Sequence, residues 1–238
     1  GRETELVARL AADDEMRRRF KHAFPESGGA ISLETITKAI ATFERSLISL
    51  GSPYDRYRYG GEPDAISPAA KRGEQLFFSE KFECYHCHAA FLFSDNVRHK
   101  RLMFPEVGFH NNALYNTDGR GAYPPDNQGL FEFTGRPEDM GKFRTPSLRN
   151  IAKTAPYMHD GSLATLVDVL RHYAAGGRVI HEGEHRGEGR RSPLKDVFIV
   201  GFELEPDEQA AMIAFLESLT DERFLNDPRH GDPSKTPR

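Results

Sequence analysis

The spacing of hydrophobic residues along the chain predicts helices far more readily than strands. In residues 3–24, hydrophobic side chains recur at helical intervals among charged ones, which predicts one or two amphipathic helices. Another helix is predicted after Ser32, because Glu34 lies in its first turn and hydrophobic residues follow along one side. The same spacing predicts helices in "SPAAKRGEQLFF", "SLATLVDVLRHYAA" and "EPDEQAAMIAFLESL". The pattern therefore indicates an all-α fold.

The helical pattern fails from about residue 105 to residue 145, where glycine, proline, asparagine and aspartate are frequent. We predict a long ordered loop there, and long loops in compact domains are usually functional. The chain is expected to divide into N-terminal helices over residues 1–50, a larger domain over 51–225 and an extended tail over 226–238.

Composition and charge exclude several classes of protein. Hydrophobic residues make up 38% and charged residues 29%, as in an ordinary folded domain. The net charge of −4 and the mixing of both signs give no reason to expect nucleic acid as a partner. No apolar run is long enough for membrane insertion, and the start "GRETELVARL" lacks a signal-peptide pattern, so the chain is expected to be mature or trimmed.

Both cysteines of the chain lie in the motif Cys84-Tyr85-His86-Cys87-His88. A Cys-x-x-Cys pair can be a redox dithiol, half of a zinc site or the anchor of a covalent haem, and a disulfide or inert pair is the further alternative. The sequence before the motif is helical and polar, which does not suit a redox dithiol. No second cysteine pair completes a zinc site, although histidines could complete it. A histidine directly after the second cysteine is what a c-type haem requires. We therefore predict a covalent haem on Cys84 and Cys87, with His88 as the proximal iron ligand.

Composition leaves the second axial ligand open, because the chain has five methionines and ten histidines. A different metal motif, His-Glu-x-x-His, occupies residues 181–185. A zinc protease needs this motif on a helix, whereas glycines surround it here, so an exposed loop is expected.

Several blocks, in order, resemble the C-terminal haem domain of the bacterial dihaem cytochrome c peroxidase and MauG family. They are residues 141–177, "FHNNALYNTDGRGAYP" and "ISLETITKAIATFERSL". The resemblance implies a c-type cytochrome domain over 51–225 with one haem c. It also implies a second haem in an N-terminal haem domain, or in a separate haem-bearing chain, as a partner. It assigns no catalytic residue to this chain.

The resemblance implies a tyrosine as the second ligand. Tyr173, twelve residues after Gly161, lies where the family's peroxidases have a methionine and where its MauG- and MbnH-like branch has a tyrosine. A phenolate stabilises oxidised iron, whereas a thioether favours the reduced form. Two alternatives stay open: Met158 is the ligand, or Tyr173 is a core aromatic. The apolar stripe of the predicted helix comprises Leu163, Leu166, Val167, Leu170, Tyr173 and Ala174.

Two weaker assignments also follow from the resemblance. Thr154 and Pro156 match positions whose main-chain carbonyls bind calcium. Arg144 matches an arginine beside the haem propionates, and a surface salt bridge is the alternative. His86 is expected to face solvent.

We expect His110, His159 and His172 near haem edges, without an assigned role. The function that the resemblance implies is oxidation of a tryptophan-type residue in a protein substrate by peroxide-derived equivalents. The alternatives are a cytochrome c peroxidase served by an electron-donor protein and an isolated electron-transfer module. Covalent haem attachment places the expected location in the periplasm.

Overall fold

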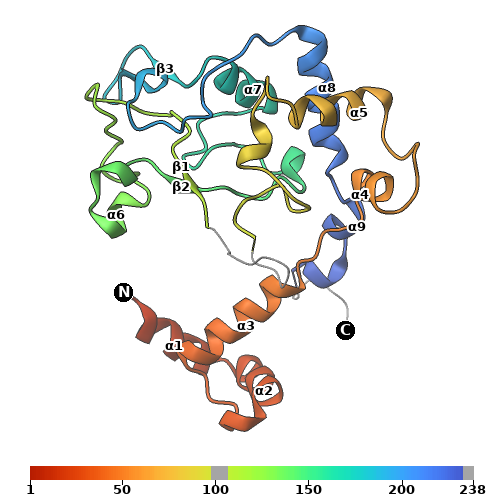
Figure 1. The fold of residues 1–238 in the computed structure, drawn as a ribbon. Helices are drawn as coiled ribbons and strands as arrows, with labels where there is room; N and C mark the ends of the chain where they lie inside the picture. The colour runs from red at the N-terminus through yellow and green to blue at the C-terminus, as the bar shows by residue number, and fades with distance from the viewer. Residues whose placement is uncertain (98–106, 233–238) are drawn as a thin grey trace. The chain divides into compact units, whose positions relative to one another are not determined.

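A computed structural model describes residues 1–97 and 107–232, which form two compact units. The smaller unit contains Gly1–Ser49 together with the described residues from Phe224 onward, and the larger unit is Leu50–Arg223 (Figure 1). Among the described helices, none is both long and apolar enough to cross a membrane.

Three helices form most of the smaller unit, and all three were predicted. They are α1 (Glu3–Ala11), α2 (Asp14–Ala23) and α3 (Leu33–Ser46). Helix α3 begins where its sequence requires, because Ser32 and Thr35 cap each other: each side chain accepts a hydrogen bond from the other's backbone N–H. Residues 226–238 were expected to be extended; a short 3₁₀ turn, η6 (Pro228–His230), lies among them, and 233–238 fall outside the described residues.

The larger unit is also built from helices, joined by long irregular segments (Figure 1). Its helices are α4 (Pro53–Arg58), α5 (Pro68–Phe77), α6 (Phe131–Thr134), α7 (Leu166–Ala174) and α8 (Pro206–Ser218), with α9 (Glu222–Leu225) at the division between units. Its strands are β1 (Phe109–His110), β2 (Phe143–Arg144), β3 (Val179–Ile180) and β4 (Gly187–Glu188), paired antiparallel as β1–β2 and β3–β4. Each strand has two residues, so the predicted all-α class is confirmed for the described chain.

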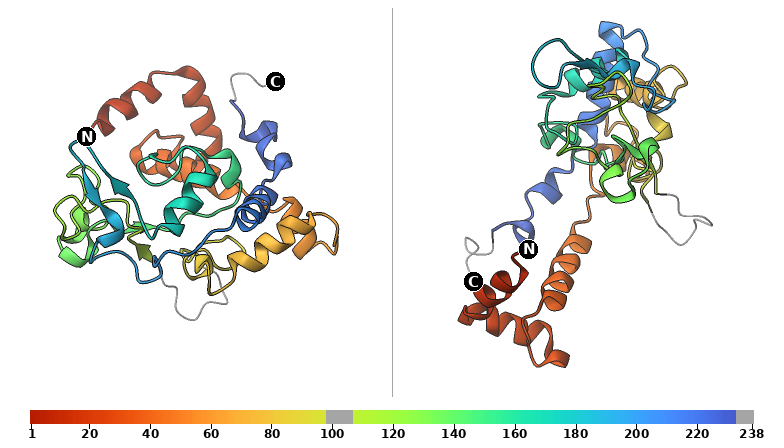
Figure 2. Two further views of the ribbon diagram at one scale, coloured as in Figure 1. Left: turned by 90° about the horizontal axis from the view of Figure 1, so that it is seen from above. Right: turned by 90° about the vertical axis from the view of Figure 1, so that its left-hand side faces the viewer.

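The core of the larger unit lies between α5 and α8, which run side by side (Figures 1 and 2). Gly73 permits this close approach, because a Cβ atom there would lie 2.0 Å from the carbonyl oxygen of Ala211. Tyr54, Phe77, Phe93 and Phe215 fill the space around these helices with edge-to-face ring contacts.

Two details of the larger unit differ from the expectations. Helix α4 was not predicted, because its six residues are too short to show a hydrophobic period, although Ser52 and Asp55 cap it as a capping box. Helix α7 begins at Leu166, so Leu163 does not belong to its stripe and instead pairs with Tyr157 in an isolated bridge.

A buried ion pair ties the start of the larger unit to the segment that follows β2. Arg149 Nη1 lies 2.8 Å from Asp55 Oδ2, and both side chains are only 6% exposed. Arg149 also donates hydrogen bonds to the carbonyl of Phe91. The guanidinium therefore connects α4, the segment after the cysteine motif and the segment before α7 through charge-assisted bonds.

We predict that Arg149→Met destabilises the protein by about 3–5 kcal/mol, because Asp55 is left as a buried charge without its partner. The double variant Asp55→Asn/Arg149→Met should recover part of this loss. Urea denaturation measures both, with Arg72→Met as the control. Arg72 pairs with Asp207 on the surface, so its replacement should cost about 0–1 kcal/mol. A loss for Arg149→Met no larger than that of the control would contradict the assignment.

Candidate haem site

The cysteine motif lies on a single tight turn. Residues Cys84–His86 form a 3₁₀ turn, η2, which Glu83 precedes in a left-handed conformation with φ of 55°. Both cysteines are free thiols and half-buried. The turn brings the two sulfur atoms to the same part of the larger unit, as two thioether bonds to one haem edge require.

The environment of the cysteines disfavours the competing chemistries. Burial raises the pKa of Cys84 to about 12, whereas a redox-active Cys-x-x-Cys thiol has a lowered pKa. Among the described residues, the group that could hold a metal ion through His, Cys, Asp or Glu is Glu80, Glu83 and His86, and it contains neither cysteine. Within residues 1–97 and 107–232, no cluster of metal-binding side chains therefore includes the cysteines.

His88 is oriented for coordination through one nitrogen. Its Nδ1 lies 2.9 Å from the carbonyl oxygen of Phe93, and because a carbonyl only accepts, Nδ1 carries the proton. Nε2 then keeps its lone pair. Burial lowers the pKa of His88, against the effect of hydrogen bonding to backbone carbonyls, so the ring stays neutral at pH 7. A neutral imidazole whose other nitrogen is anchored to the backbone is the form in which histidine binds metals.

Tyr173 faces the same site from helix α7. Cys87 and Cys84 lie near enough to its hydroxyl to raise its pKa, whereas the Asn112 side chain lies near enough to lower it. Burial raises the pKa of Tyr173 to about 12, whereas the Asn112 amide lowers it by donating to the phenolate. Asn112 Nδ2 also lies 3.3 Å from Met158 Sδ. One asparagine therefore contacts both residues that the sequence offered as the second axial ligand.

The backbone is strained at three positions of this site. Phe93, Ala113 and Met158 have φ values of 53°, 62° and 69°, in the left-handed region that residues with a side chain rarely adopt. The carbonyl of Phe93 accepts the hydrogen bond from His88 Nδ1. Ala113 directly follows Asn112, which contacts both candidate ligands, and Met158 is one of those candidates. Strain of this kind persists where the surrounding structure enforces it, and it clusters at functional sites.

His110 holds the long loop against the cysteine motif. Its Nδ1 lies 2.6 Å from Asp196 Oδ2 and its Nε2 lies 2.5 Å from Asp95 Oδ2. Hydrogen bonds to Asp196, to the Cys87 thiol and to Asp95 raise the pKa of His110 to about 11, although burial opposes them. His110 is therefore protonated at neutral pH and joins three segments of the chain.

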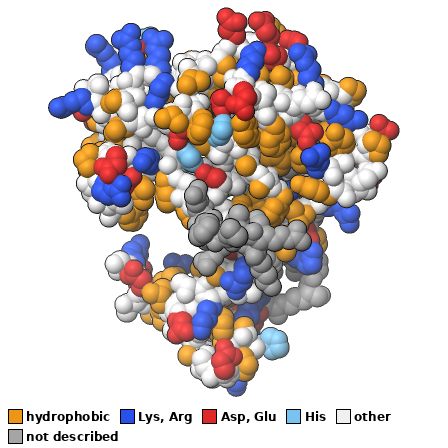
Figure 3. Space-filling model, in the orientation of Figure 1, with side chains coloured by type: hydrophobic (Ala, Val, Ile, Leu, Met, Phe, Trp, Pro, Cys, Tyr) orange, Lys and Arg blue, Asp and Glu red, His pale blue; other side chains and the backbone are white. Residues whose placement is uncertain are grey.

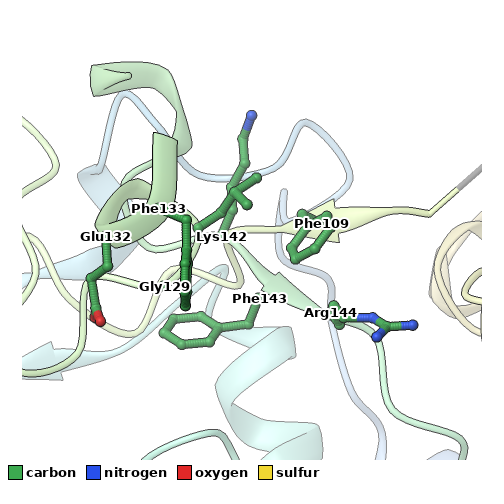
Figure 4. A pocket seen from close by; sticks show the side chains of 8 residues that line it. Phe109, Gly129, Glu132, Phe133, Lys142, Phe143 and Arg144 are labelled. Carbon is green, nitrogen blue, oxygen red and sulfur yellow. The ribbon is translucent and has the colours of Figure 1, made fainter. Parts of the chain in front are cut away.

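Arg144 lies at the rim of a groove of about 590 Å³ formed around β1, β2 and α6 (Figure 4). Phe109, Phe133 and Phe143 form its apolar walls, and the Arg144 side chain points away from them. Arg144 is exposed and donates a hydrogen bond to Asn96 Oδ1 at 3.3 Å. The alternative of a surface salt bridge gains no support, because Arg144 forms no ion pair within the described residues.

The other predicted histidines have well-defined surroundings. The prediction for His86 was wrong: instead of facing solvent, it is half-buried, bonded to Glu83 and stacked on Phe198 with the ring centroids 3.8 Å apart. His159 stacks on Phe143 at 3.7 Å, and neither ring nitrogen has a hydrogen-bond partner in the described structure. His172 is buried and contacts the carbonyl of Asn112 through Nε2.

The remaining predicted residues lie apart from these. Thr154 and Pro156 are exposed, and in the described part of the chain no hydrogen bond to their carbonyl oxygens is found. Residues 181–185 connect β3 to β4 without a helix, which confirms the expected loop and removes the geometry a zinc protease needs. Basic side chains gather over this hairpin, at the upper left of Figure 3.

The sequence did not reveal the residues that organise the site. Asn112, Asp95 and Asp196 were not singled out, because they are polar residues in irregular segments and follow no period. The available signal was the block "FHNN" in the long loop, where two amides follow a histidine.

We predict that His110→Gln destabilises the protein most at pH 6 to 7, by an amount that shrinks toward pH 10. The folded pKa of about 11 lies above the value of about 6.5 expected in the unfolded chain. The contribution is therefore complete below pH about 6.5 and is lost as the pH rises toward 11. Urea midpoints at three pH values measure it, with the exposed His181→Gln as control. A difference in urea midpoint between wild type and His110→Gln that stays the same at all three pH values would contradict the prediction.

The arrangement fits a c-type haem. Two neighbouring thiols, a neutral imidazole whose Nδ1 is held by the Phe93 carbonyl, and a phenol near an amide lie in one region. Asn112 Oδ1 is buried there with no hydrogen-bond partner among the described residues. The thiols can form thioethers, His88 can bind one face of the iron, and Tyr173 or Met158 the other.

Comparisons with known proteins agree with this chemistry. A model of the family described as di-haem cytochrome c peroxidase matches residues 1–63. Methylamine utilization protein MauG of Methylophilus methylotrophus is 35% identical over 215 residues, covering 90% of this chain and 54% of the relative. Cytochrome-c peroxidase IdrP1 of Pseudomonas sp. (strain SCT) is 35% identical over 213 residues, covering 83% and 51%. The chain thus spans about half the length of these relatives.

A solved structure supports the same relationship over nearly all of the chain. The crystal structure of a MauG-like protein associated with microbial copper homeostasis superposes with a TM-score of 0.90 at 50% identity, covering 98% of this chain and 66% of that one. The sequence relatives and this structural neighbour, together with the Cys-x-x-Cys-His site, lead to one conclusion: the chain belongs to the dihaem cytochrome c peroxidase and MauG family.

Proposed function

We propose that this chain is a haem c domain of a MauG-like dihaem enzyme, with Cys84 and Cys87 as the thioether anchors and His88 as the proximal ligand. The distal ligand is Tyr173. One observation carries the proposal: the Tyr173 hydroxyl lies close to both cysteines and to the Asn112 amide. A haem bound there supplies one-electron redox chemistry at iron.

Two of the chain's own residues, Phe93 and Asn112, act on the groups that would bind the iron. His88 presents Nε2 because Phe93 holds the proton on Nδ1. The Asn112 amide stabilises the deprotonated phenol of Tyr173, and a phenolate ligand favours oxidised iron. A domain of this kind stores an oxidising equivalent better than it delivers a reducing one.

The whole enzyme is proposed to use peroxide at a second haem, outside this chain, and to oxidise a tryptophan-type residue of a protein substrate through this domain. The partners are therefore an N-terminal haem domain or a separate haem-bearing chain, and the substrate protein. Periplasmic location accompanies covalent haem attachment. Arg144 is proposed to bind a haem propionate, since it is exposed at a groove rim and free of any acidic partner in the described structure.

A cytochrome c peroxidase with methionine ligation is the second candidate. It is favoured by the contact between Met158 Sδ and Asn112, which places a thioether beside the same amide. That contact would leave Met158 as the distal ligand and make the domain an acceptor of electrons from a donor protein.

We predict that Tyr173→Phe changes the ferric absorption spectrum and raises the reduction potential, because a phenolate ligand is lost. Met158→Leu is the matched control, since it removes the other candidate ligand and keeps the apolar volume. It should leave both quantities unchanged. Spectroelectrochemical titration measures them. If Met158→Leu moved the spectrum and potential while Tyr173→Phe did not, the peroxidase candidate would replace the proposal.

The carbonyl groups of Thr154 and Pro156 are proposed to bind calcium, because both are exposed oxygen ligands, which a hard cation prefers. We predict that calcium raises the thermal midpoint of the haem-loaded protein and that a chelator reverses the change. Magnesium at the same concentration is the control and should have little effect, because it gives up its water ligands reluctantly. A midpoint independent of calcium would refute the site.

A further inference from the structure

Two buried tyrosines lie side by side next to the haem site, with different hydrogen-bond acceptors. The ring centroids of Tyr115 and Tyr123 are 5.3 Å apart in an edge-to-face arrangement, and the residues are 7% and 3% exposed. Tyr115 donates its phenolic proton to Asp160 Oδ2 at 2.7 Å. Tyr123 donates to the amide oxygen of Asn111 at 2.8 Å. One tyrosine therefore faces a carboxylate and the other faces a group that cannot take a proton at neutral pH.

Asp160 accepts hydrogen bonds on both carboxylate oxygens, from Tyr115 Oη at Oδ2 and from the Ser162 N–H at Oδ1. Burial raises the pKa of its carboxyl group, but hydrogen bonds from Tyr115 and Ser162 outweigh burial, and the net pKa is lowered. Arg178 Nη1 lies 3.5 Å from Asp160 Oδ2 and adds a positive charge. The side chain of Asp160 is only 7% exposed, so water does not compete freely for the same proton.

Neighbouring side chains link the proposed haem ligand to the hydrophobic cluster that contains Tyr115. The Tyr173 hydroxyl contacts Asn112, and Asn112 contacts the sulfur of Met158. Met158 packs against the cluster that contains both buried tyrosines. Met158 therefore lies next to both Asn112 and the cluster of buried tyrosines.

Arg178 and His185 border Tyr115 on the side of the β3–β4 hairpin. The Arg178 guanidinium lies 5.6 Å from the centre of the Tyr115 ring, and the ring centroids of His185 and Tyr115 are 5.9 Å apart. His185 belongs to the loop between β3 and β4 and is partly exposed. The tyrosine therefore lies between the haem site and the surface.

We propose that Tyr115 is a redox-active tyrosine that carries an oxidising equivalent away from the haem, with Asp160 as its proton acceptor. The proposal rests on the proposed haem function. In the step, Tyr115 gives one electron to the one-electron oxidant that peroxide generates at haem. Its O–H bond breaks, and the proton forms a new O–H bond on Asp160. The products are a neutral tyrosyl radical and a neutral carboxylic acid, and the oxidant is reduced by one electron.

The carboxylate is what distinguishes Tyr115 from its neighbour. An oxidised phenol is strongly acidic, so a tyrosine without a base at its hydroxyl retains an unstable positive charge when it loses an electron. In the described structure the acceptor of the Tyr123 hydroxyl is the Asn111 amide, so we expect Tyr123 to be harder to oxidise. The two rings share a cluster and similar burial, which makes Tyr123→Phe the matched control for Tyr115→Phe.

The test uses the intact dihaem enzyme, in which the haem of this chain and the partner haem are both loaded. It is labelled with ring-deuterated tyrosine, mixed with hydrogen peroxide and freeze-quenched for electron paramagnetic resonance. Wild type and Tyr123→Phe should give an organic radical signal that narrows on ring deuteration. Tyr115→Phe and Asp160→Asn should lose most of it, the second because the ring remains but the base is gone. Haem content and thermal midpoint, measured on each sample, show that the variants are folded and loaded.

The outcomes separate this inference from the proposed function. If the samples contain haem that responds to peroxide but wild type yields no tyrosine-derived radical, the redox role of Tyr115 is wrong and the haem function stands. An equal signal in Tyr115→Phe also overturns it. If this chain binds no haem, or if neither haem of the dihaem enzyme changes its absorption with peroxide, both proposals fail together.

Discussion

The site depends on the position of one side chain, that of Asn112. Its amide nitrogen reaches the sulfur of Met158, its side chain reaches the hydroxyl of Tyr173, and its carbonyl accepts from His172. Through these contacts an irregular loop is held against helix α7 and against the strained segment at residue 158. Without them the phenol of Tyr173 would have burial alone, which favours its neutral form. With them it has a donor that stabilises the charged form an iron ligand requires.

The cysteine side of the site is also held in place by hydrogen bonds between polar groups. The loop around β1 is ordered mainly by charged and polar side chains, because its strands are only two residues long. His110 between two carboxylates, and His88 on the carbonyl of Phe93, fix that loop and the cysteine turn relative to each other. Buried polar groups of this kind specify one arrangement when all are paired and are costly when one partner is removed. This accounts for an ordered site in a segment with little regular secondary structure.

Most of the helices could be predicted from the sequence, and the Cys-x-x-Cys-His motif predicts a haem anchor, but the contacts that support the site could not be predicted. Ser32 indicates the start of helix α3, because capping is a local interaction. Cys84, Cys87 and His88 predict a haem, because the motif is compact. Contacts such as Asp160 with Tyr115 join residues 45 positions apart and carry no periodic signal. Helix α4 was missed because six residues cannot show a period. His86 was misjudged because its partner Phe198 is distant in the sequence.

The central claim is that His88 and Tyr173 bind the two faces of one haem iron, and a crystal structure of the haem-loaded protein measures it most directly. The account predicts His88 Nε2 and Tyr173 Oη both within bonding distance of the iron, with Asn112 donating to the phenolate oxygen. Met158 Sδ bonded to the iron, or a Tyr173 hydroxyl turned away from it, would contradict the account.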